Sequence, residues 1–439
     1  MPQNVVAYVT LTLLCCATRL AAQNPVPVTA VRAARMLDVT SGTYIPNPVI
    51  LIAKGKITDA GSGLAIPPGA AIIDLPAATL LPGLIDAHTH LMARMAEGNQ
   101  NEKYILQLAG KSEAYRALEG AASARDTLRA GFTTVRDVEN EGSGYADVAL
   151  RDAIIRGLVE GPRMQVATRA IAATGGYFPE RLSPDVPSFP RGAQMVTGAD
   201  EARRATREQI FYGADLIKVY ADFLDIASPN TTRSLHATLT PEELRAIVDE
   251  AHKGGHRVAA HATTREGIRN AVEAGVDSIE HGTDVDRELL TLMSQHGTFL
   301  VPTSAAYSDG YETATPARQA ELEPTMQALR AEIAMAKDAH VRLASGLDAS
   351  TGVEQGKNAS EPVSLVRLGL TPLEAIRAST TSAAELMGWQ DQVGSLEKGR
   401  FADIIAVRGD PLTDITELRR VTFVMKGGTV VRQDSETKQ

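Results

Sequence analysis

The 439-residue sequence contains only two cysteines, Cys15 and Cys16, and both lie in the first two dozen residues. If that segment is removed, no cysteine remains, so disulfides play no part in stability even in an oxidising compartment. The sequence also has no cluster of Lys and Arg, and its net charge is −9. This argues against a surface for nucleic acid or anionic lipids. We therefore expect a small-molecule or short-peptide substrate, no nucleic acid and no stable membrane association.

An apolar run from Val5 to Ala17 is too short for the roughly 20 residues that a membrane-spanning helix needs. Small residues follow it, and a polar segment begins at Gln23. This pattern predicts a signal peptide over residues 1–22 and export to the periplasm or the extracellular space, although the usual positive n-region is missing. An N-terminal core helix, a membrane anchor and a lipid anchor are the alternatives.

Both ends of the remaining chain have a β-like pattern. Residues 28–79 contain short apolar runs separated by Gly and Pro, and the same texture returns in GRFADIIAVRGDPL and VTFVMKGGTVVRQ. Neither stretch alone makes a stable sheet. We therefore predict one small β-sandwich domain, formed by residues 23–79 together with residues 391–439.

The middle of the chain, residues 80–390, alternates short apolar runs with segments of helical spacing. One helical segment, TPEELRAIVDEAHK, begins with Thr240 as N-cap, Pro241 at the first position and Glu243 completing a capping box. Eight strand and helix units in about 300 residues predict a (β/α)8 TIM barrel within an α/β fold. An open doubly wound sheet is the alternative, but it normally has a Gly-rich phosphate turn after its first strand, and this sequence has none there. The eight predicted strands are GLIDAHTH, FTTVRDV, RMQVATRA, LIKVYAD, HRVAAHA, DSIEHGT, TFLVPTS and VRLASGLD.

Chemically active side chains occur where these predicted strands end, which is the functional face of a barrel. His88 and His90 are one residue apart, so both imidazoles point to the same side of the first strand. The other strand-end candidates are Lys218, His261, His281 and Asp348. Four further histidines, which lie at helix ends or before strands, are predicted to be surface or capping residues: His252, His256, His296 and His340.

Four imidazoles and a carboxylate are suitable ligands for Zn²⁺ or a related first-row ion. Lys218 is unusual among them, because an ammonium group repels a metal ion and accepts no hydrogen bond. A buried lysine has a lowered pKa, however, and its neutral amine can take up CO2 to form a carbamate. Such a carbamate could bridge two metal ions about 3.5 to 4 Å apart.

In the order and spacing of these residues, the chain resembles the amidohydrolase superfamily. The similarity covers nearly the whole chain after the signal peptide and includes LPGLIDAHTH, GFTTVRD, IKVYAD, VAAHATT, SIEHGT, ASGLD and TPLEAIRASTTSAAELMG. It is closest to the two-metal members with a carboxylated lysine, among the imidazolonepropionase-like and prolidase-like dipeptidases and carboxypeptidases. Imidazolonepropionase itself is disfavoured, because it uses one metal and lacks the bridging lysine.

The resemblance implies a role for each strand-end residue. His88, His90 and Asp348 would bind the first metal ion, His261 and His281 the second, and carboxylated Lys218 would bridge them. A hydroxide between the metals would attack the amide carbonyl, with Asp348 as general base and then acid. Tyr220 would donate a hydrogen bond to the carbonyl oxygen as negative charge develops; a barrel-lining aromatic without that role is the alternative. Relatives often assemble as rings or octamers, so we expect a homo-oligomer.

The resemblance also implies that the substrate is an amide that releases a C-terminal amino acid, and some secreted relatives hydrolyse ochratoxin. The long segment 174–200 contains Tyr177, Phe178 and Phe189, which suit a lid over an apolar side chain; a structural or oligomer-contact loop is the alternative. A substrate carboxylate would bind one of three residues that the sequence does not choose among: Arg233, His236 or Arg181.

The chain departs from the family pattern at Lys357, because relatives often have a histidine before the residue that corresponds to Asn358. Two other functions stay open. Hydrolysis of a cyclic amide, lactone or phosphoester is possible on the same centre, because fold and metal do not fix the substrate. A non-catalytic metal-binding or assembly protein is disfavoured, because the ligand set and Asp348 are complete.

Overall fold

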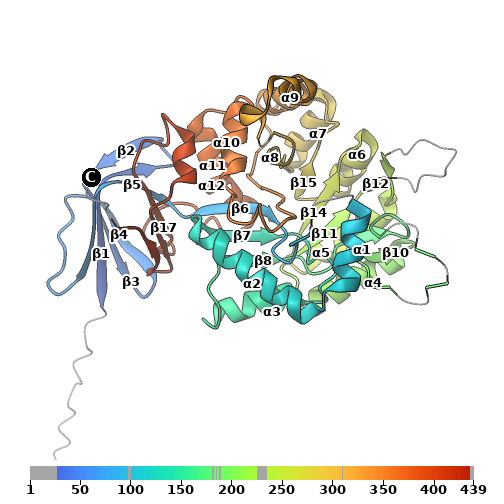
Figure 1. Ribbon diagram of the computed structural model, residues 1–439, viewed down its shortest axis with the longest axis horizontal. Helices are drawn as coiled ribbons and strands as arrows, with labels where there is room; N and C mark the ends of the chain where they lie inside the picture. Colours follow the sequence, from blue (N-terminus) through green and yellow to red (C-terminus); the bar gives the residue numbers. More distant parts are fainter. Residues whose placement is uncertain are drawn as a thin grey trace, which may run out of the picture.

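The two ends of the chain meet in one mixed eight-stranded sheet (Figure 1). The computed structural model describes residues 27–96, 100–179, 182–183, 185–186, 189–224, 235–308 and 310–435. The predicted signal peptide lies outside these ranges. The meeting of the two ends agrees with the prediction, and the packing of this domain as a sandwich stays a prediction. The strands of the sheet are β1 (Val28–Asp38), β2 (Thr43–Pro46), β3 (Pro48–Ala53), β4 (Lys56–Ser62), β5 (Ala71–Pro82), β17 (Ile404–Val407), β18 (Phe423–Lys426) and β19 (Thr429–Gln433).

Strand β5 joins the two halves of this sheet. It pairs in parallel with β1 and antiparallel with β17, where Leu81 lies opposite Ile405. The sheet therefore extends to Pro82, directly before the first strand of the predicted barrel.

The middle of the chain forms parallel strands in the predicted order. One parallel sheet contains β6 (Leu84–Thr89), β7 (Phe132–Asp137) and β8 (Arg163–Val166). A second parallel sheet contains, in spatial order, β10 (Gln194–Val196), β9 (Ile171–Ala173), β11 (Leu216–Tyr220), β14 (Arg257–Ala262), β15 (Ser278–His281) and β16 (Phe299–Val301). A hydrogen bond from Asp215 N to Val166 O, at 2.8 Å, connects β8 to the start of β11. On the other side, Leu343 forms a parallel β-bridge with Leu300 of β16, and Ala87 N of β6 donates a hydrogen bond to Ser345 O. These connections agree with a closed barrel whose eighth strand is the segment around residues 341–348.

Helices surround these strands (Figure 1). None of the helices in the described ranges is long and apolar enough to cross a membrane. The helices are α1 (Gln100–Gly110), α2 (Glu113–Arg129), α3 (Ala146–Ile155), α4 (Ala199–Phe211), α5 (Pro241–Lys253), α6 (Arg265–Ala274), α7 (Arg287–His296), α8 (Ala305–Ser308), α9 (Pro316–Asp338), α10 (Ser360–Arg367), α11 (Pro372–Ala378) and α12 (Thr381–Leu386), with 3-10 turns η1 (Tyr311–Thr313) and η2 (Ile415–Arg419).

Helix α5 begins as predicted. Thr240 accepts a hydrogen bond from Glu243 N at 3.2 Å, and the Glu243 side chain accepts one from Thr240 N at 2.8 Å. This capping box satisfies two amide groups that the first turn leaves unpaired.

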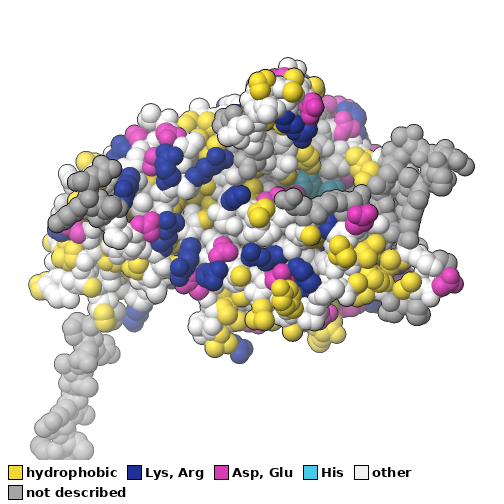
Figure 2. Space-filling view, in the orientation of Figure 1, with side chains coloured by type: hydrophobic (Ala, Val, Ile, Leu, Met, Phe, Trp, Pro, Cys, Tyr) yellow, Lys and Arg dark blue, Asp and Glu magenta, His cyan; other side chains and the backbone are white. Residues whose placement is uncertain are grey.

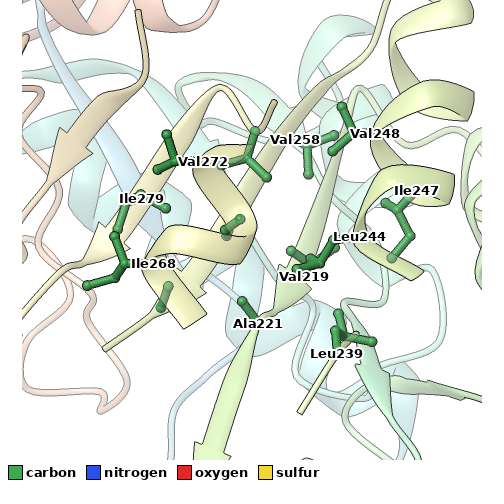
Figure 3. Close-up of a cluster of buried hydrophobic side chains, with 14 of the residues drawn as sticks. Val219, Ala221, Leu239, Leu244, Ile247, Val248, Val258, Ile268, Val272 and Ile279 are labelled. Carbon is green, nitrogen blue, oxygen red and sulfur yellow. The ribbon is translucent and has the colours of Figure 1, made fainter. Parts of the chain in front are cut away.

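The main hydrophobic core lies between the strands and the helices that follow them (Figure 3). Val219, Val258 and Ile279 of three adjacent strands are fully buried there against helices α5 and α6. Burial of side chains of this size contributes roughly 1.5 to 3 kcal/mol each. The packed layer fixes the strands, and so it fixes the residues at their ends.

Candidate metal centre

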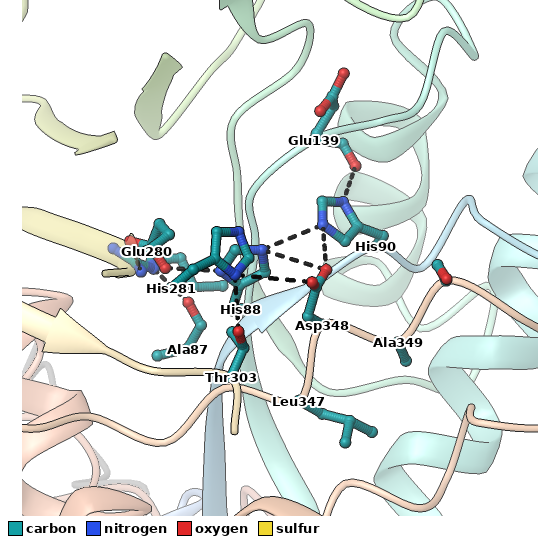
Figure 4. A network of polar contacts seen from close by, with 12 residues as sticks. Ala87, His88, His90, Glu139, Glu280, His281, Thr303, Leu347, Asp348 and Ala349 are labelled. Atoms are coloured by element: carbon teal, nitrogen blue, oxygen red, sulfur yellow. Dashed lines mark hydrogen bonds and ion pairs between the residues drawn. The ribbon is translucent and has the colours of Figure 1, made fainter. Parts of the chain in front are cut away.

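Three of the predicted ligands lie together at the ends of two neighbouring strand segments (Figure 4). Nε2 of His88 and Nε2 of His90 are 3.2 Å apart, and Oδ1 of Asp348 lies 3.5 Å and 3.1 Å from them. Ligands about 2.0 to 2.1 Å from a tetrahedral ion are separated by about 3.3 Å. The three atoms therefore have the spacing of one face of a tetrahedral metal site.

Asp86 holds these two strand segments in register. Its Oδ1 accepts hydrogen bonds from His88 N at 3.0 Å and Leu347 N at 3.1 Å, and its Oδ2 accepts one from Asn358 at 2.7 Å. In addition, Asp348 N bonds His88 O at 2.9 Å. One buried carboxylate thus fixes the backbone on both sides of the donor group.

His261, His281 and Lys218 bring the second group of predicted ligands to the same place. The rings of His261 and His281 have centroids 4.6 Å apart, and the ring of His281 lies 5.2 Å from that of His88. Lys218 is buried in β11, two residues before Tyr220, which lies opposite His261 in the adjacent strand. Figure 2 shows histidine side chains in a hollow on this face, below α9.

The protonation of these groups suits metal binding. Burial lowers the pKa of His88 and His261 well below the usual value, and it lowers that of His281 to about 4, so these imidazoles are neutral near pH 7. Burial also lowers the pKa of Lys218, against the opposing charges of Glu280, Glu139 and Asp348, which favours the neutral amine. Neutral nitrogen atoms have the free electron pair that a metal ion or CO2 requires.

His90 is different, because the acids around it favour a positive charge. Burial alone would lower its pKa, but the carboxylates of Glu141, Asp348 and Glu139 outweigh this and raise the pKa to about 10. The same charges attract a metal cation at this point. The donor set therefore fits a divalent ion by its spacing and by its charge.

Carboxylates and a hydroxyl orient the outer nitrogen of three imidazoles. Nδ1 of His88 bonds Oε2 of Glu280 at 2.7 Å, and Nδ1 of His90 lies 3.0 Å from Oε1 of Glu141. Nδ1 of His281 bonds Oγ1 of Thr303 at 2.7 Å. Such partners fix the ring and raise the basicity of the nitrogen that faces the metal.

The backbone is strained where three of these residues leave their strands. His281, Thr303 and Asp348 have φ values of 74°, 48° and 61°. Side chains other than glycine rarely adopt this left-handed conformation, which costs of order 1 to 3 kcal/mol. The surrounding hydrogen bonds hold these residues in place despite that cost.

The predicted substrate residues lie in different surroundings. Tyr220 is buried beside His261, with ring centroids 4.9 Å apart, but its hydroxyl donates to Glu139 at 2.5 Å. Tyr177 is also buried and contacts Tyr220, with ring centroids 4.2 Å apart.

Phe178 is half-buried and stacks on the ring of Tyr104, and Phe189 packs against the same hydrophobic cluster. His236 is exposed in strand β13 (Leu235–Ala237), which pairs with β12 (Asp222–Leu224). Arg233 and Arg181 lie outside the described residues.

The unusual Lys357 does not lie among the metal donors. It lines a cavity of about 320 Å³ with Arg419 and Arg432, while the next residue, Asn358, bonds Asp86. The four histidines that were predicted to be surface or capping residues lie at helix ends or before strands, as expected: His252, His256, His296 and His340.

The acids that support the metal donors, and the partners of these acids, were not predicted from the sequence. Arg136 of β7 donates to Oε1 of Glu280 at 2.7 Å and so holds the acid that orients His88. A signal for these residues exists in the sequence. Charged side chains within buried strand runs, such as Asp86 in GLIDAHTH and Glu280 in DSIEH, are stable only with partners.

The chain is similar to known proteins over most of its length. The model of a family described as the amidohydrolase family matches residues 79–431. Ochratoxinase from Aspergillus niger is 31% identical over 389 residues, which cover 80% of this chain and 75% of that protein. A crystal structure of a Xaa-Pro dipeptidase with bound methionine is 33% identical, with a TM-score of 0.80 over 92% of this chain and 100% of that one. A prolidase complexed with N-methylphosphonate-L-proline is 30% identical, with a TM-score of 0.81 over 93% and 100%.

Proposed function

The chain belongs to the amidohydrolase family and is a hydrolase that acts on C–N bonds, and we propose that it is a secreted, two-metal enzyme that cleaves the amide of dipeptides or N-acyl amino acids. Its site would lie on a (β/α)8 barrel next to a small β-sandwich domain. The observation that carries the proposal is the convergence of His88 Nε2, His90 Nε2 and Asp348 Oδ1 within 3.1 to 3.5 Å beside the buried Lys218.

Six side chains would hold two divalent ions, of which Zn²⁺ suits the nitrogen-rich set best. We propose that Lys218, carboxylated by CO2, bridges the two ions. Bound there, the ions would polarise the scissile carbonyl and activate a water molecule. The remaining ligands divide between the two positions, with His88, His90 and Asp348 at the first and His261 and His281 at the second.

Asp348 is the residue best placed to move protons. Its Oδ1 is within hydrogen-bonding range of His90 Nε2, and its Oδ2 lies 4.0 Å from His281 Nδ1, so the carboxylate lies between the two groups of ligands. The imidazoles of His88, His90 and His281 outweigh burial and hold its pKa below the usual range. It would accept a proton from the attacking water and deliver it to the leaving nitrogen.

The proposed roles of the aromatic residues follow from their contacts. Tyr220, next to His261, would donate to the carbonyl oxygen once its hydroxyl turns from Glu139. Tyr177 and Phe178 form an apolar wall with Phe223, whose ring lies 5.4 Å and 5.0 Å from theirs. This wall suits an apolar side chain of the substrate. His236 would contact the substrate at the rim, and Arg233 is proposed with it as a carboxylate partner.

Dipeptide and ochratoxin chemistry are proposed because the similar proteins are a dipeptidase, a prolidase and an ochratoxinase. The names dipeptidase and prolidase imply an amide that releases a C-terminal amino acid or imino acid. Export through the predicted signal peptide and a homo-oligomeric assembly, with an octamer as one form, are part of the same proposal.

The test combines metal analysis with a substrate screen. We expect metal analysis to find about two divalent ions per chain. A crystal structure of the metal-loaded protein should show a carbamate on the side chain of Lys218. Fewer than one ion per chain with an unmodified Lys218 would refute the two-metal centre. Dipeptides, N-acyl amino acids and ochratoxin A should be hydrolysed, whereas activity confined to lactones, cyclic amides or phosphoesters would overturn the substrate class.

A further inference from the structure

Glu139 is a buried acid next to the metal donors whose carboxylate has one open oxygen. It follows strand β7 and is 0% exposed. Its Oε2 accepts hydrogen bonds from the hydroxyl of Tyr220 at 2.5 Å and from that of Tyr177 at 3.2 Å. Its Oε1 has no hydrogen-bond partner among the described residues.

The side chain of Glu139 lies beside the metal donors, because one of its carboxylate oxygens is within 4.8 Å of a ring nitrogen of His90 and of a carboxylate oxygen of Glu141. The carbonyl oxygen of Glu139, and not its carboxylate, faces Nδ1 of His90 at 3.4 Å, and Figure 4 shows the carboxylate directed away from that ring. Nε2 of His90 faces His88 and Asp348, and Glu141 satisfies Nδ1. The donor group of His88, His90 and Asp348 is therefore formed without the Glu139 side chain.

The protons around Glu139 are already assigned. A phenol has one proton, and the nearest acceptor for the proton of Tyr220 is Glu139. Tyr177 likewise has only oxygen acceptors within reach, from Glu139, Glu141 and the neighbouring phenols. The atom left open in this cluster is thus a carboxylate oxygen, which can accept a hydrogen bond.

A buried carboxylate oxygen without a partner is costly, and a cationic donor compensates that cost best. The surrounding rings of Tyr177, Tyr220 and Phe223 are at most 6% exposed, so water screens this position weakly. The group that fits here is an ammonium.

The position of Glu139 relative to the metal donors indicates which ammonium group of a substrate would bind there. Glu139 adjoins the donor group at His90, and Tyr220 connects it to His261, because Tyr220 contacts Glu139 through its hydroxyl and His261 through its ring. In a dipeptide, the α-amino nitrogen is two bonds from the scissile carbonyl carbon, so it lies next to the reacting centre. We propose that Glu139 binds the protonated α-amino group of the substrate and makes the enzyme prefer dipeptides with a free amino terminus over acyl amino acids without one. This rests on the proposed function.

The experiment compares a substrate pair that differs only in the amino group, with the metal-loaded, full-length enzyme. The pair is leucyl-Xaa and its des-amino analogue 4-methylpentanoyl-Xaa, where Xaa is the C-terminal residue that gives the fastest turnover. A charge-assisted hydrogen bond at a buried site predicts a roughly tenfold to hundredfold higher kcat/KM for leucyl-Xaa. Glu139→Gln should bring the ratio close to one, because it lowers kcat/KM for leucyl-Xaa more than for the des-amino analogue, whose turnover changes only through the contact of Glu139 with Tyr220.

Glu332→Gln is the matched control, because Glu332 is also a buried acid, in α9, and belongs to neither candidate metal group of the described residues. It should keep the wild-type ratio, and metal content should be equal in all three proteins. Equal rates for the two substrates with wild type, or an unchanged ratio in Glu139→Gln, would overturn the role of Glu139 while leaving amide hydrolysis intact. If the wild-type enzyme hydrolyses neither substrate, the proposed function itself is refuted.

Discussion

Glu280 accepts a hydrogen bond from Nδ1 of His88 at 2.7 Å, although 192 positions separate the two residues in the sequence. Arg136 and Ser278 hold the other oxygen of this carboxylate. The ring of His88 is thereby fixed with Nε2 towards Asp348. A residue outside the predicted ligand set thus determines how one ligand is presented.

Glu280→Gln should weaken metal binding, because the amide is a poorer acceptor and leaves Arg136 without a buried counter-charge. Substitution of such partners typically lowers metal affinity tenfold to a hundredfold. Competition with a chelator and metal analysis after dialysis measure the change. Metal retention equal to that of wild type and of the Glu332→Gln control would contradict the assignment.

Asp348→Asn should lower kcat by roughly a hundredfold to ten thousandfold, because the amide cannot act as a base. The amide keeps Oδ1, so the metal content should change much less than the rate. Steady-state kinetics and metal analysis of the same preparation separate the two effects. Asp338→Asn, at an exposed position of α9, is the control. Full activity in Asp348→Asn would refute the proposed role.

Asp86→Ala should destabilise the protein by roughly 3 kcal/mol or more, because two buried amides and the Asn358 side chain lose their acceptor. Asp86→Asn keeps an oxygen for the two amides and should cost less. The free energy of unfolding in urea measures both changes. Equal and small losses in the two variants would show that Asp86 does not fix these strands.

The buried acids Glu332 and Glu361 should make stability depend on pH. Burial raises the pKa of each to about 8, from 4.5. Below pH 4.5 these groups are protonated in both states, and between pH 4.5 and 8 only the unfolded chain ionises, so stability falls as pH rises. Glu332→Gln should therefore gain stability relative to wild type by up to about 1.4 kcal/mol per pH unit in this range.

Chemical denaturation at pH 5 and pH 8 tests this prediction. The variant and the wild type should differ little at pH 5, and the variant should be more stable at pH 8. A difference that does not grow with pH would mean that Glu332 ionises normally in the folded protein.

The predicted ligands could be read from the sequence because their signal is local. Each stands at the end of an apolar run, and parallel strands bring such ends to one side. His88 and His90 needed only their one-residue spacing, and the capping box of α5 only the segment Thr240 to Glu243. Local patterns of this kind can be recognised in the sequence because they do not depend on contacts with distant segments.

The supporting contacts could not be predicted, because they join strands that are distant in the chain. Nothing near His88 indicates Glu280 as its partner, and nothing near Tyr220 indicates Glu139. Tyr177 was expected in a lid over the substrate or in a structural loop; the structure shows it buried against Tyr220, and its role towards the substrate stays a prediction. It turns inwards because acids and phenols from other segments offer its hydroxyl hydrogen bonds, and these partners are visible only in three dimensions.

The pairing of Leu81 in β5 with Ile405 in β17 has a consequence for the order of folding. One edge of β5 remains unpaired until β17 is synthesised, which happens only after the whole barrel segment. Such long-range pairing is slow. Until then an apolar edge stays open to pairing with other chains. A chain truncated before Ile404 would keep every metal ligand and still be prone to aggregate.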